Sequence, residues 1–91
     1  MPEKSWSVEF SKASLKSLEK LEKNISLKIL DRIEELADTK NPLLYKDVRP
    51  LAGKLKGFFR LRVGEFRAIF ELDSRNKRIG ILAVVPRKKA Y

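Results

Sequence analysis

The residues best suited to chemistry in this sequence are arginines in its C-terminal half. Arg60, Arg62 and Arg67 lie close together, and Arg87 and Tyr91 lie near the end of the chain. A guanidinium is a planar fork of donors that binds phosphate in a bidentate manner. A tyrosine beside cations can stack on a base or exchange a proton, because nearby positive charge favours its phenolate. These residue types therefore indicate chemistry on a phosphate-containing substrate.

The positive charge of the sequence is confined to its second half. The net charge is +9, yet residues 1–44 carry eight Lys or Arg and eight Asp or Glu. Residues 45–91 carry thirteen basic residues against four acidic ones, so the whole excess lies there. Such an asymmetry indicates an acidic partner, which is nucleic acid, an acidic protein or a membrane surface.

Two chemically important residue types are missing. The sequence has no cysteine, which excludes disulfides and thiolate metal sites and makes a reducing cytoplasm the expected location. It has no histidine either, which excludes the commonest general base and the commonest metal ligand. No apolar run approaches the roughly 20 residues that span a membrane, and the N-terminal residues lack the apolar stretch of a signal peptide. We expect a cytoplasmic protein that uses neither a metal nor a small-molecule cofactor.

The N-terminal half should form one strand and two helices that position the basic half. Residues 6–10 alternate large apolar and polar side chains, which predicts a half-buried strand. Ser11 is a suitable N-cap for a first helix. Leucines at helical spacing follow and are expected in the core, at Leu15, Leu18 and Leu21. A second apolar stripe over residues 25–37 predicts a second helix, antiparallel to the first.

The C-terminal half should be a sheet. Residues 41–57 contain two prolines and two glycines and are expected to be a long irregular connection. Residues 58–63 and 66–72 alternate and predict two strands, joined by a two-residue turn at Gly64-Glu65 with glycine first, as a type II′ turn prefers. Residues 79–85 are apolar on both faces, as expected of a central strand.

The predicted element order is strand, helix, helix and three antiparallel strands. Such an order is typical of an α+β fold in which a helix pair packs on one face of a small, mostly antiparallel sheet. We expect residues 1–91 to form one domain, since neither a repeat nor a linker interrupts them.

The predicted hairpin assigns side chains to faces. If residues 64–65 form the loop, Val63 pairs with Phe66 and Arg62 lies opposite Arg67, and directly opposed residues share a face. One face is then apolar, with Phe59, Leu61, Val63, Phe66, Ala68, Phe70 and Leu72. The other face carries Arg60, Arg62 and Arg67 with Ile69 and Glu71.

Like charges directly opposite one another destabilise a sheet, so this clustering suggests that an anion normally lies among the three arginines. The alternative is an ordinary solvated face, with Glu65 and Glu71 as partial compensation.

Three segments of the sequence resemble the RelE/ParE toxins. They are Leu51-Ala52-Gly53, the hairpin of residues 59–70, and the ending Val85-Pro86-Arg87-Lys88-Lys89-Ala90-Tyr91. In that family the sheet characteristically reads Tyr-Arg-x-Arg-x-Gly-Asp-Tyr-Arg, and a basic segment with a tyrosine follows. The ending is most similar to the archaeal RelE type. The resemblance covers nearly the whole chain and implies a RelE-like toxin domain over residues 1–91.

The resemblance implies a metal-independent endoribonuclease that enters the ribosomal A site and cuts messenger RNA, through attack of a ribose 2′-hydroxyl on the adjacent phosphate. Arg60 and Arg62 would then grip the RNA backbone and help to orient the nucleophile. Arg67 would stabilise the extra negative charge of the transition state. Arg87 would bind phosphate or aid the leaving group, and Tyr91 would stack on a base or act in acid–base chemistry.

The resemblance also implies a partner, an acidic antitoxin of the RelB type that folds on binding and blocks or deforms the basic cluster. The ribosome and messenger RNA are the other expected partners. Phosphates of RNA or ribosome would contact the lysines of the basic half, Lys54, Lys56, Lys88 and Lys89.

Two other functions fit parts of this pattern. A ParE-like toxin would poison DNA gyrase by binding, without RNA chemistry. A non-catalytic RNA-binding module would fit the charge, but the expected arginine face lacks the aromatic platform on which such modules stack bases.

Overall fold

The computed structural model describes residues 5–88, which form two helices packed against a five-stranded sheet. The elements, in chain order, are β1 (Ser7–Phe10), α1 (Lys12–Lys20), α2 (Lys23–Asp38), the 3₁₀ helix η1 (Pro42–Leu44), β2 (Val48–Pro50), the 3₁₀ helix η2 (Gly53–Leu55), β3 (Phe59–Val63), β4 (Phe66–Asp73) and β5 (Arg78–Pro86). None of the helices within residues 5–88 combines the length and the hydropathy that a membrane-spanning helix requires.

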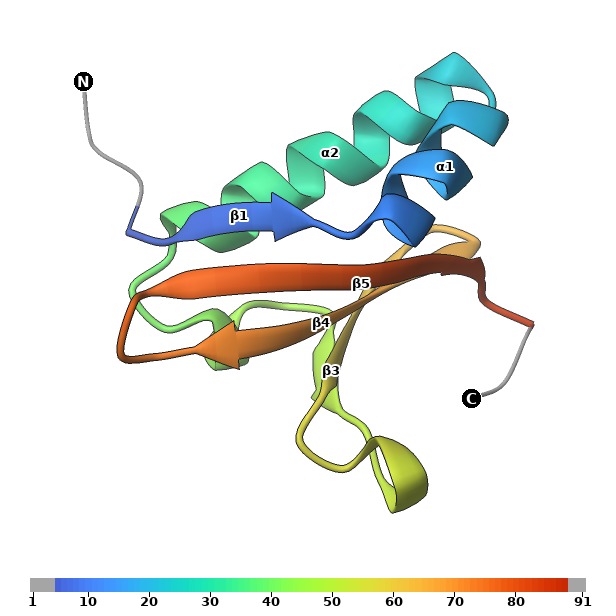
Figure 1. Cartoon of the computed structure of the whole chain (residues 1–91). Helices are drawn as coiled ribbons and strands as arrows, with labels where there is room; N and C mark the ends of the chain where they lie inside the picture. Colours follow the sequence, from blue (N-terminus) through green and yellow to red (C-terminus); the bar gives the residue numbers. More distant parts are fainter. Residues whose placement is uncertain (1–4, 89–91) are drawn as a thin grey trace.

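The strand order in the sheet is β1-β5-β4-β3-β2, and only the β1–β5 pair is parallel. Both long helices cover one face of this sheet (Figure 1). The predicted α+β class and the helix pair on one face are confirmed. The structure also contains a strand that the sequence did not predict. This is β2, a three-residue edge strand inside the segment that was expected to be irregular. It ends in Pro50, a residue that is tolerated at a sheet edge.

The first helix begins where the sequence predicts. The Oγ of Ser11 accepts a hydrogen bond from the backbone N–H of Ser14 at 3.0 Å, as an N-cap does. Its hydroxyl also donates to the carbonyl of Leu82 at 2.7 Å, which fixes the start of α1 to β5. The prediction that Leu15 belongs to the core is wrong, because this side chain is 48% exposed. The helix is short, and of its two leucines only Leu18 is buried, so Leu15 lies on the rim.

The core lies between the helix pair and the inner face of the sheet. Its largest fully buried apolar side chains come from α2 and from three strands: Ile29, Ile33, Leu36, Leu61, Phe70, Ile79 and Ile81. The rings of Phe59 and Phe70 are 5.7 Å apart across β3 and β4, within the favourable range for aromatic pairs. The apolar face predicted for the hairpin is therefore the core face.

A bulge in β5 explains why that strand is apolar without simple alternation. Ile69 pairs with Ala83 and Phe70 pairs with Ile81, so Leu82 is an extra residue without a partner in β4. Without this insertion, Ile81 and Val84 would point to opposite faces, because their separation is odd. With it, both are buried in the core. The bulge therefore keeps apolar side chains of β5 in the core on both sides of Leu82.

Candidate functional site

The hairpin that carries the predicted site has the expected register. Val63 pairs with Phe66 and Arg62 pairs with Arg67, with residues 64–65 as the loop. Gly64 has a positive φ of 57°, as the first central position of such a turn requires. Arg62 and Arg67 are therefore direct cross-strand neighbours on the face away from the helices.

Beta-strand β2 adds an arginine that the sequence interpretation missed. Arg49 pairs with Arg60, and Val48 beside it pairs with the buried Leu61, so Arg49 points away from the core. We call Arg49, Arg60, Arg62 and Arg67 the arginine face. The signal was present in the sequence, since Val48 and Arg49 begin an apolar–polar alternation. Two nearby prolines and a length of only three residues concealed it.

The other three guanidinium groups of the arginine face act electrostatically on Arg60. The pKa of Arg60 is lowered, first by burial and then by the positive charges of Arg67, Arg49 and Arg62. A bound anion would relieve that repulsion. Ile69 lies between these side chains and is only 4% exposed, consistent with arginine stems that cover it. Among residues 5–88, no acceptor reaches the buried Nε of Arg67. The surface therefore concentrates positive charge and offers a free donor, which suits it to hold an anion.

The beginning of the C-terminal tail lies beside the hairpin turn. The backbone N–H of Arg87 donates to the carbonyl of Glu65 at 2.6 Å, and the side chains of Arg87 and Lys88 are exposed. This contact places Arg87 at the end of the hairpin that carries Arg62 and Arg67. The expected site residues Lys89 and Tyr91 fall outside the residues that the structure describes.

Two other predicted binding residues lie apart from the tail. Lys54 is in η2 and Lys56 follows it, and both are exposed on the connection between β2 and β3. The strand β3 separates this connection from the β3–β4 turn, where Arg87 lies. The basic residues therefore form a band along the hairpin, with the two lysines at one end and the tail at the other.

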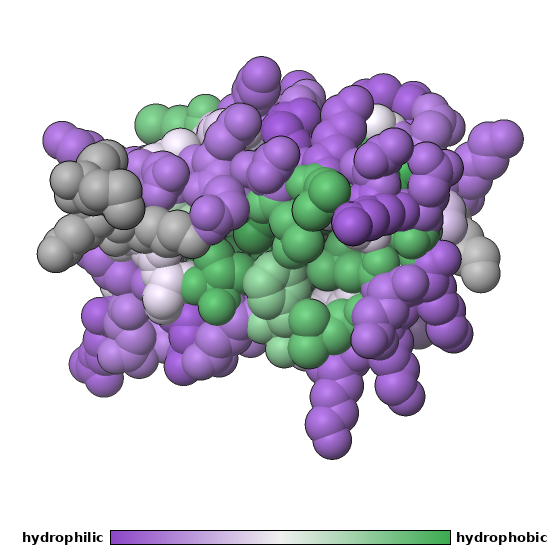
Figure 2. All heavy atoms as spheres, turned by 90° about the horizontal axis from the view of Figure 1, so that it is seen from above, coloured by the Kyte–Doolittle hydropathy of each residue, from purple (hydrophilic) through white to green (hydrophobic). Residues whose placement is uncertain are grey.

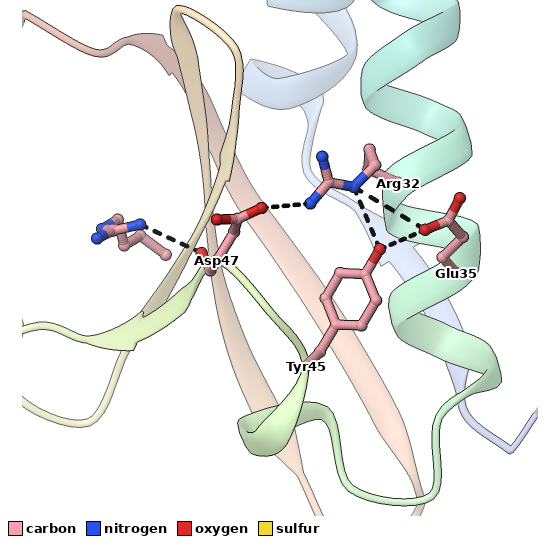
Figure 3. Close-up of polar contacts among 5 residues, drawn as sticks. Arg32, Glu35, Tyr45 and Asp47 are labelled. Carbon is pink, nitrogen blue, oxygen red and sulfur yellow. Dashed lines mark hydrogen bonds and ion pairs between the residues drawn. The ribbon is translucent and has the colours of Figure 1, made fainter.

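A polar cluster joins α2 to the edge of the arginine face (Figure 3). The Nη2 of Arg32 donates to the carboxylate of Asp47 at 2.7 Å, and its Nε donates to the hydroxyl of Tyr45 at 3.1 Å. That hydroxyl donates in turn to Glu35. Burial and the hydrogen bond to Glu35 raise the pKa of Tyr45. Burial alone would lower the pKa of Arg32, but hydrogen bonds to Asp47 and Tyr45 raise it.

The ion pair in this cluster should make the protein sensitive to acid. The hydrogen bond from Arg32 lowers the pKa of Asp47 below its ordinary value. A carboxylate with a lowered pKa stabilises the fold above its unfolded-state pKa of about 3.9, and this contribution is lost as the pH falls through the folded-state pKa. We predict that the difference between the thermal unfolding curves of the wild type and Asp47→Asn, measured from pH 7 to pH 3, is largest near neutrality and shrinks as the pH falls below about 4. A constant difference across that range would contradict the prediction.

A second surface lies on the opposite side of the molecule, over the helices. It is an open apolar groove between β1, α1 and α2, lined by Phe10, Leu15, Leu18 and Leu30. Figure 2 shows apolar atoms at the centre of this side and hydrophilic side chains around them. Lys12, Lys16 and Glu19 are at its border.

Metal ligands do not gather in the structure. Within residues 5–88, no group of three or more Asp or Glu side chains is placed to hold a metal ion.

Comparison with known proteins shows that this chain is similar to toxins of toxin–antitoxin systems. Residues 8–91 match the family model described as the ParE toxin of type II toxin–antitoxin system, parDE. No curated protein is significantly similar in sequence.

Solved structures of toxin–antitoxin complexes are similar over most of the chain. A chain of the RelBE2 toxin–antitoxin complex of Mycobacterium tuberculosis is 26% identical in sequence, with a TM-score of 0.79. The match covers 92% of this chain and 93% of that chain. The archaeal RelE–RelB complex of Pyrococcus horikoshii is 28% identical, covers 94% and 99%, and has a TM-score of 0.77. The RelB–RelE complex of Methanococcus jannaschii is 26% identical, covers 87% and 89%, and has a TM-score of 0.68.

Proposed function

The chain belongs to the ParE toxin family of type II toxin–antitoxin systems, within the RelE/ParE superfamily, and we propose that it is a ribosome-dependent messenger RNA endoribonuclease. It would cut messenger RNA in the ribosomal A site in the cytoplasm and so inhibit translation. The observation that carries the proposal is the arginine face, which gathers four guanidinium groups beside the start of the basic tail.

The proposed reaction is a transesterification that the chain's own cations can assist. The ribose 2′-oxygen forms a bond to the adjacent phosphorus, the bond to the 5′-oxygen breaks, and the products are a 2′,3′-cyclic phosphate and a 5′-hydroxyl. The proton of the 2′-hydroxyl leaves, and the 5′-oxygen gains a proton. Negative charge grows on the phosphate oxygens in the transition state, and preorganised guanidinium groups stabilise it. The mechanism therefore needs neither a metal nor histidine.

Each basic residue has a proposed part in this reaction. Arg60 and Arg62 bind the RNA backbone and orient the nucleophile, while Arg67, on the neighbouring strand β4, stabilises the transition state. Arg87 binds phosphate or assists the leaving group, and Tyr91 stacks on a base or transfers a proton. We add Arg49 as a further backbone-binding residue, because it pairs with Arg60. The lysines that would bind ribosomal phosphates are Lys54, Lys56, Lys88 and Lys89.

Primer extension on a defined messenger RNA tests the proposal. We expect new 5′ ends within the A-site codon when the protein and purified ribosomes are both present, and intact RNA when either is omitted. If the protein binds the RNA and the RNA stays intact, the protein is a non-catalytic RNA-binding module and not an endoribonuclease. RNA that is neither bound nor cut by the folded protein would remove both functions.

A second candidate function is gyrase poisoning, which the ParE description of the matching family favours. A supercoiling assay with purified DNA gyrase distinguishes the two. Inhibition of supercoiling by a protein that leaves ribosome-bound RNA intact would establish the ParE-like function. Uninhibited gyrase beside A-site cleavage would exclude it.

The proposed protein partner is a RelB-type antitoxin, because the similar solved structures are complexes of that kind. We propose that an amphipathic segment of this antitoxin docks in the groove over β1, α1 and α2. The exposed Leu15 offers apolar area there, and Lys12 and Lys16 at its border suit an acidic segment. Docking on this side would leave further antitoxin residues to cover the arginine face.

Leu15→Glu should weaken antitoxin binding while the fold is kept. The change removes apolar area from the groove and adds a negative charge that repels an acidic segment, so we expect the dissociation constant to rise by at least about tenfold. Calorimetric titration with the cognate antitoxin measures this. Leu44→Glu is the matched control, because Leu44 is 81% exposed and does not line the groove. Equal affinities of the two variants would place the antitoxin elsewhere.

A further inference from the structure

Asp47 occupies a junction between the helix layer and the arginine face. It directly precedes β2, and its carbonyl accepts a hydrogen bond from the backbone N–H of Arg62 at 3.0 Å. The neighbouring Val48 pairs with Leu61. If β2 extended by one residue in regular geometry, Asp47 would therefore lie opposite Arg62, and its carboxylate would share a face with the arginines.

The backbone of Asp47 turns away from that regular path. Its φ is +68°, in the left-handed region that few residues other than glycine adopt, although aspartate is among those enriched there. The carboxylate instead reaches Arg32 on α2, with Nη2 and Oδ2 2.7 Å apart. The Arg32 side chain is only 18% exposed and is itself held by Tyr45 and Glu35. The carboxylate thus bonds to a well-anchored cation outside the arginine face.

The carbonyl of the same residue contacts the arginine face. Besides the Arg62 backbone, it accepts a hydrogen bond from Nη1 of Arg60 at 3.2 Å. Asp47 therefore contacts the arginines through its neutral carbonyl and pairs its carboxylate with Arg32, while the charge of that carboxylate still acts on Arg60 and Arg62 without a direct contact. A carbonyl orients a guanidinium and leaves its positive charge uncompensated, whereas a carboxylate would neutralise it.

We propose that Arg32 is a positioning residue for the arginine face, which holds the Asp47 carboxylate on α2 so that Arg60 and Arg62 stay free to bind RNA phosphate. The ion pair is an observed contact, and the role in RNA binding rests on the proposed function. Without Arg32, the released carboxylate can rotate toward Arg60 or Arg62 and occupy donors that the phosphate needs. The inhibitory group is then internal to the protein, and a second substitution can remove it.

Cleavage kinetics with four variants test the proposal. Arg32→Ala should lower kcat/KM per folded molecule about tenfold, the effect of one weakened charge-assisted contact. Arg32→Lys keeps a cation near Asp47 and should retain most of the rate. The double variant Arg32→Ala with Asp47→Asn should recover most of the loss, since the released group no longer carries charge. A residue with a merely structural role would show no such recovery.

The matched control is Arg78→Ala. Arg78 pairs with Asp73 at 3.1 Å and with Glu9 at 3.6 Å, so this change also removes an arginine with two acidic partners, but near the β1 edge of the sheet. We expect it to retain the wild-type rate. Equal losses in Arg78→Ala and Arg32→Ala, or a double variant as slow as Arg32→Ala, would overturn the proposal.

A readout in the free protein separates this inference from the proposed function. The side-chain nitrogen resonances of Arg60 and the hydrogen exchange of the Arg62 amide report directly on the two contacts to the Asp47 carbonyl. Both should change in Arg32→Ala and stay near wild-type values in Arg32→Lys and Arg78→Ala. If the wild type cleaves no RNA but these signals change, the proposed function fails and the positioning contact stands. If the signals do not change, the positioning role is wrong whatever the RNA assay shows.

Discussion

Replacing Arg67 by alanine should lower the rate of ribosome-dependent RNA cleavage by about 10²- to 10³-fold, the range observed when one preorganised donor to a transition state is removed. Arg67 lies on β4 between Arg62 on β3 and Val85 on β5, so its backbone is held on both sides. Its buried Nε has no hydrogen-bond acceptor among residues 5–88. The backbone of Arg67 is thus held before the substrate arrives, and its Nε remains available as a donor to a phosphate.

Single-turnover cleavage of a defined messenger RNA on purified ribosomes measures this effect and separates the chemical step from binding. The loss should appear in the rate constant at saturating ribosomes, because Arg67 is proposed to act on charge that develops only in the transition state. Arg75→Ala is the control, since it also removes one arginine charge, but from the exposed turn between β4 and β5. A rate constant that is unchanged in Arg67→Ala would remove this residue from the chemistry, and a loss confined to KM would make it a binding residue.

The part of this site that could be predicted from sequence is the part governed by strict alternation. A two-residue loop with glycine first sets the hairpin register, and the register then assigns Arg62 opposite Arg67 without any knowledge of distant contacts. The same logic separates the aromatic core face from the arginine face. Both assignments depend only on neighbours in the chain, which is why they are confirmed.

The features that escaped prediction depend on contacts between distant segments. The strand β2 is three residues long and exists because it pairs with β3, so Arg49 joins the arginine face through that pairing alone. The orientation of Asp47 depends on Arg32, fifteen positions earlier in the chain. No local pattern signals that an aspartate before a strand will take a positive φ and face a helix.

Exposure of Leu15 was missed for a related reason. Helical spacing shows that Leu15 and Leu18 lie on neighbouring parts of one helix surface, but not how much of that surface another element covers. The bulge at Leu82 is likewise invisible in a sequence that is apolar at nearly every position of β5. In both places the sequence shows which residues are apolar. It does not show how much of α1 another element covers or where the register of β5 shifts.

The second large effect concerns stability. Phe70→Ala should lower the free energy of unfolding by about 3–5 kcal/mol, because it removes a fully buried ring and leaves a cavity in a well-packed core. That ring is 5.7 Å from the ring of Phe59, so an aromatic pair is lost as well. A domain of this size has a total stability of only about 5–14 kcal/mol. The substitution should therefore bring the isolated protein close to its unfolding threshold.

Urea unfolding followed by circular dichroism measures this change, with Leu44→Ala as the control. Leu44 is 81% exposed, so its truncation should change the stability by no more than about 0.5 kcal/mol. A Phe70→Ala midpoint equal to that of the control would show that the core between β4 and α2 is not packed as described.

The same variant also tests whether core and chemistry are separable on one strand. Phe70 and Arg67 both lie on β4 but point to opposite faces of the sheet, since their separation is odd and the bulge lies in the neighbouring strand. Cleavage per folded molecule should therefore fall far less in Phe70→Ala than in Arg67→Ala, even though the stability falls far more. Because antitoxin binding favours the folded state, the cognate antitoxin should restore the unfolding midpoint of Phe70→Ala toward that of the free wild type. The opposite ranking of the two variants in the stability and cleavage assays is what distinguishes a residue that builds the fold from one that acts on RNA.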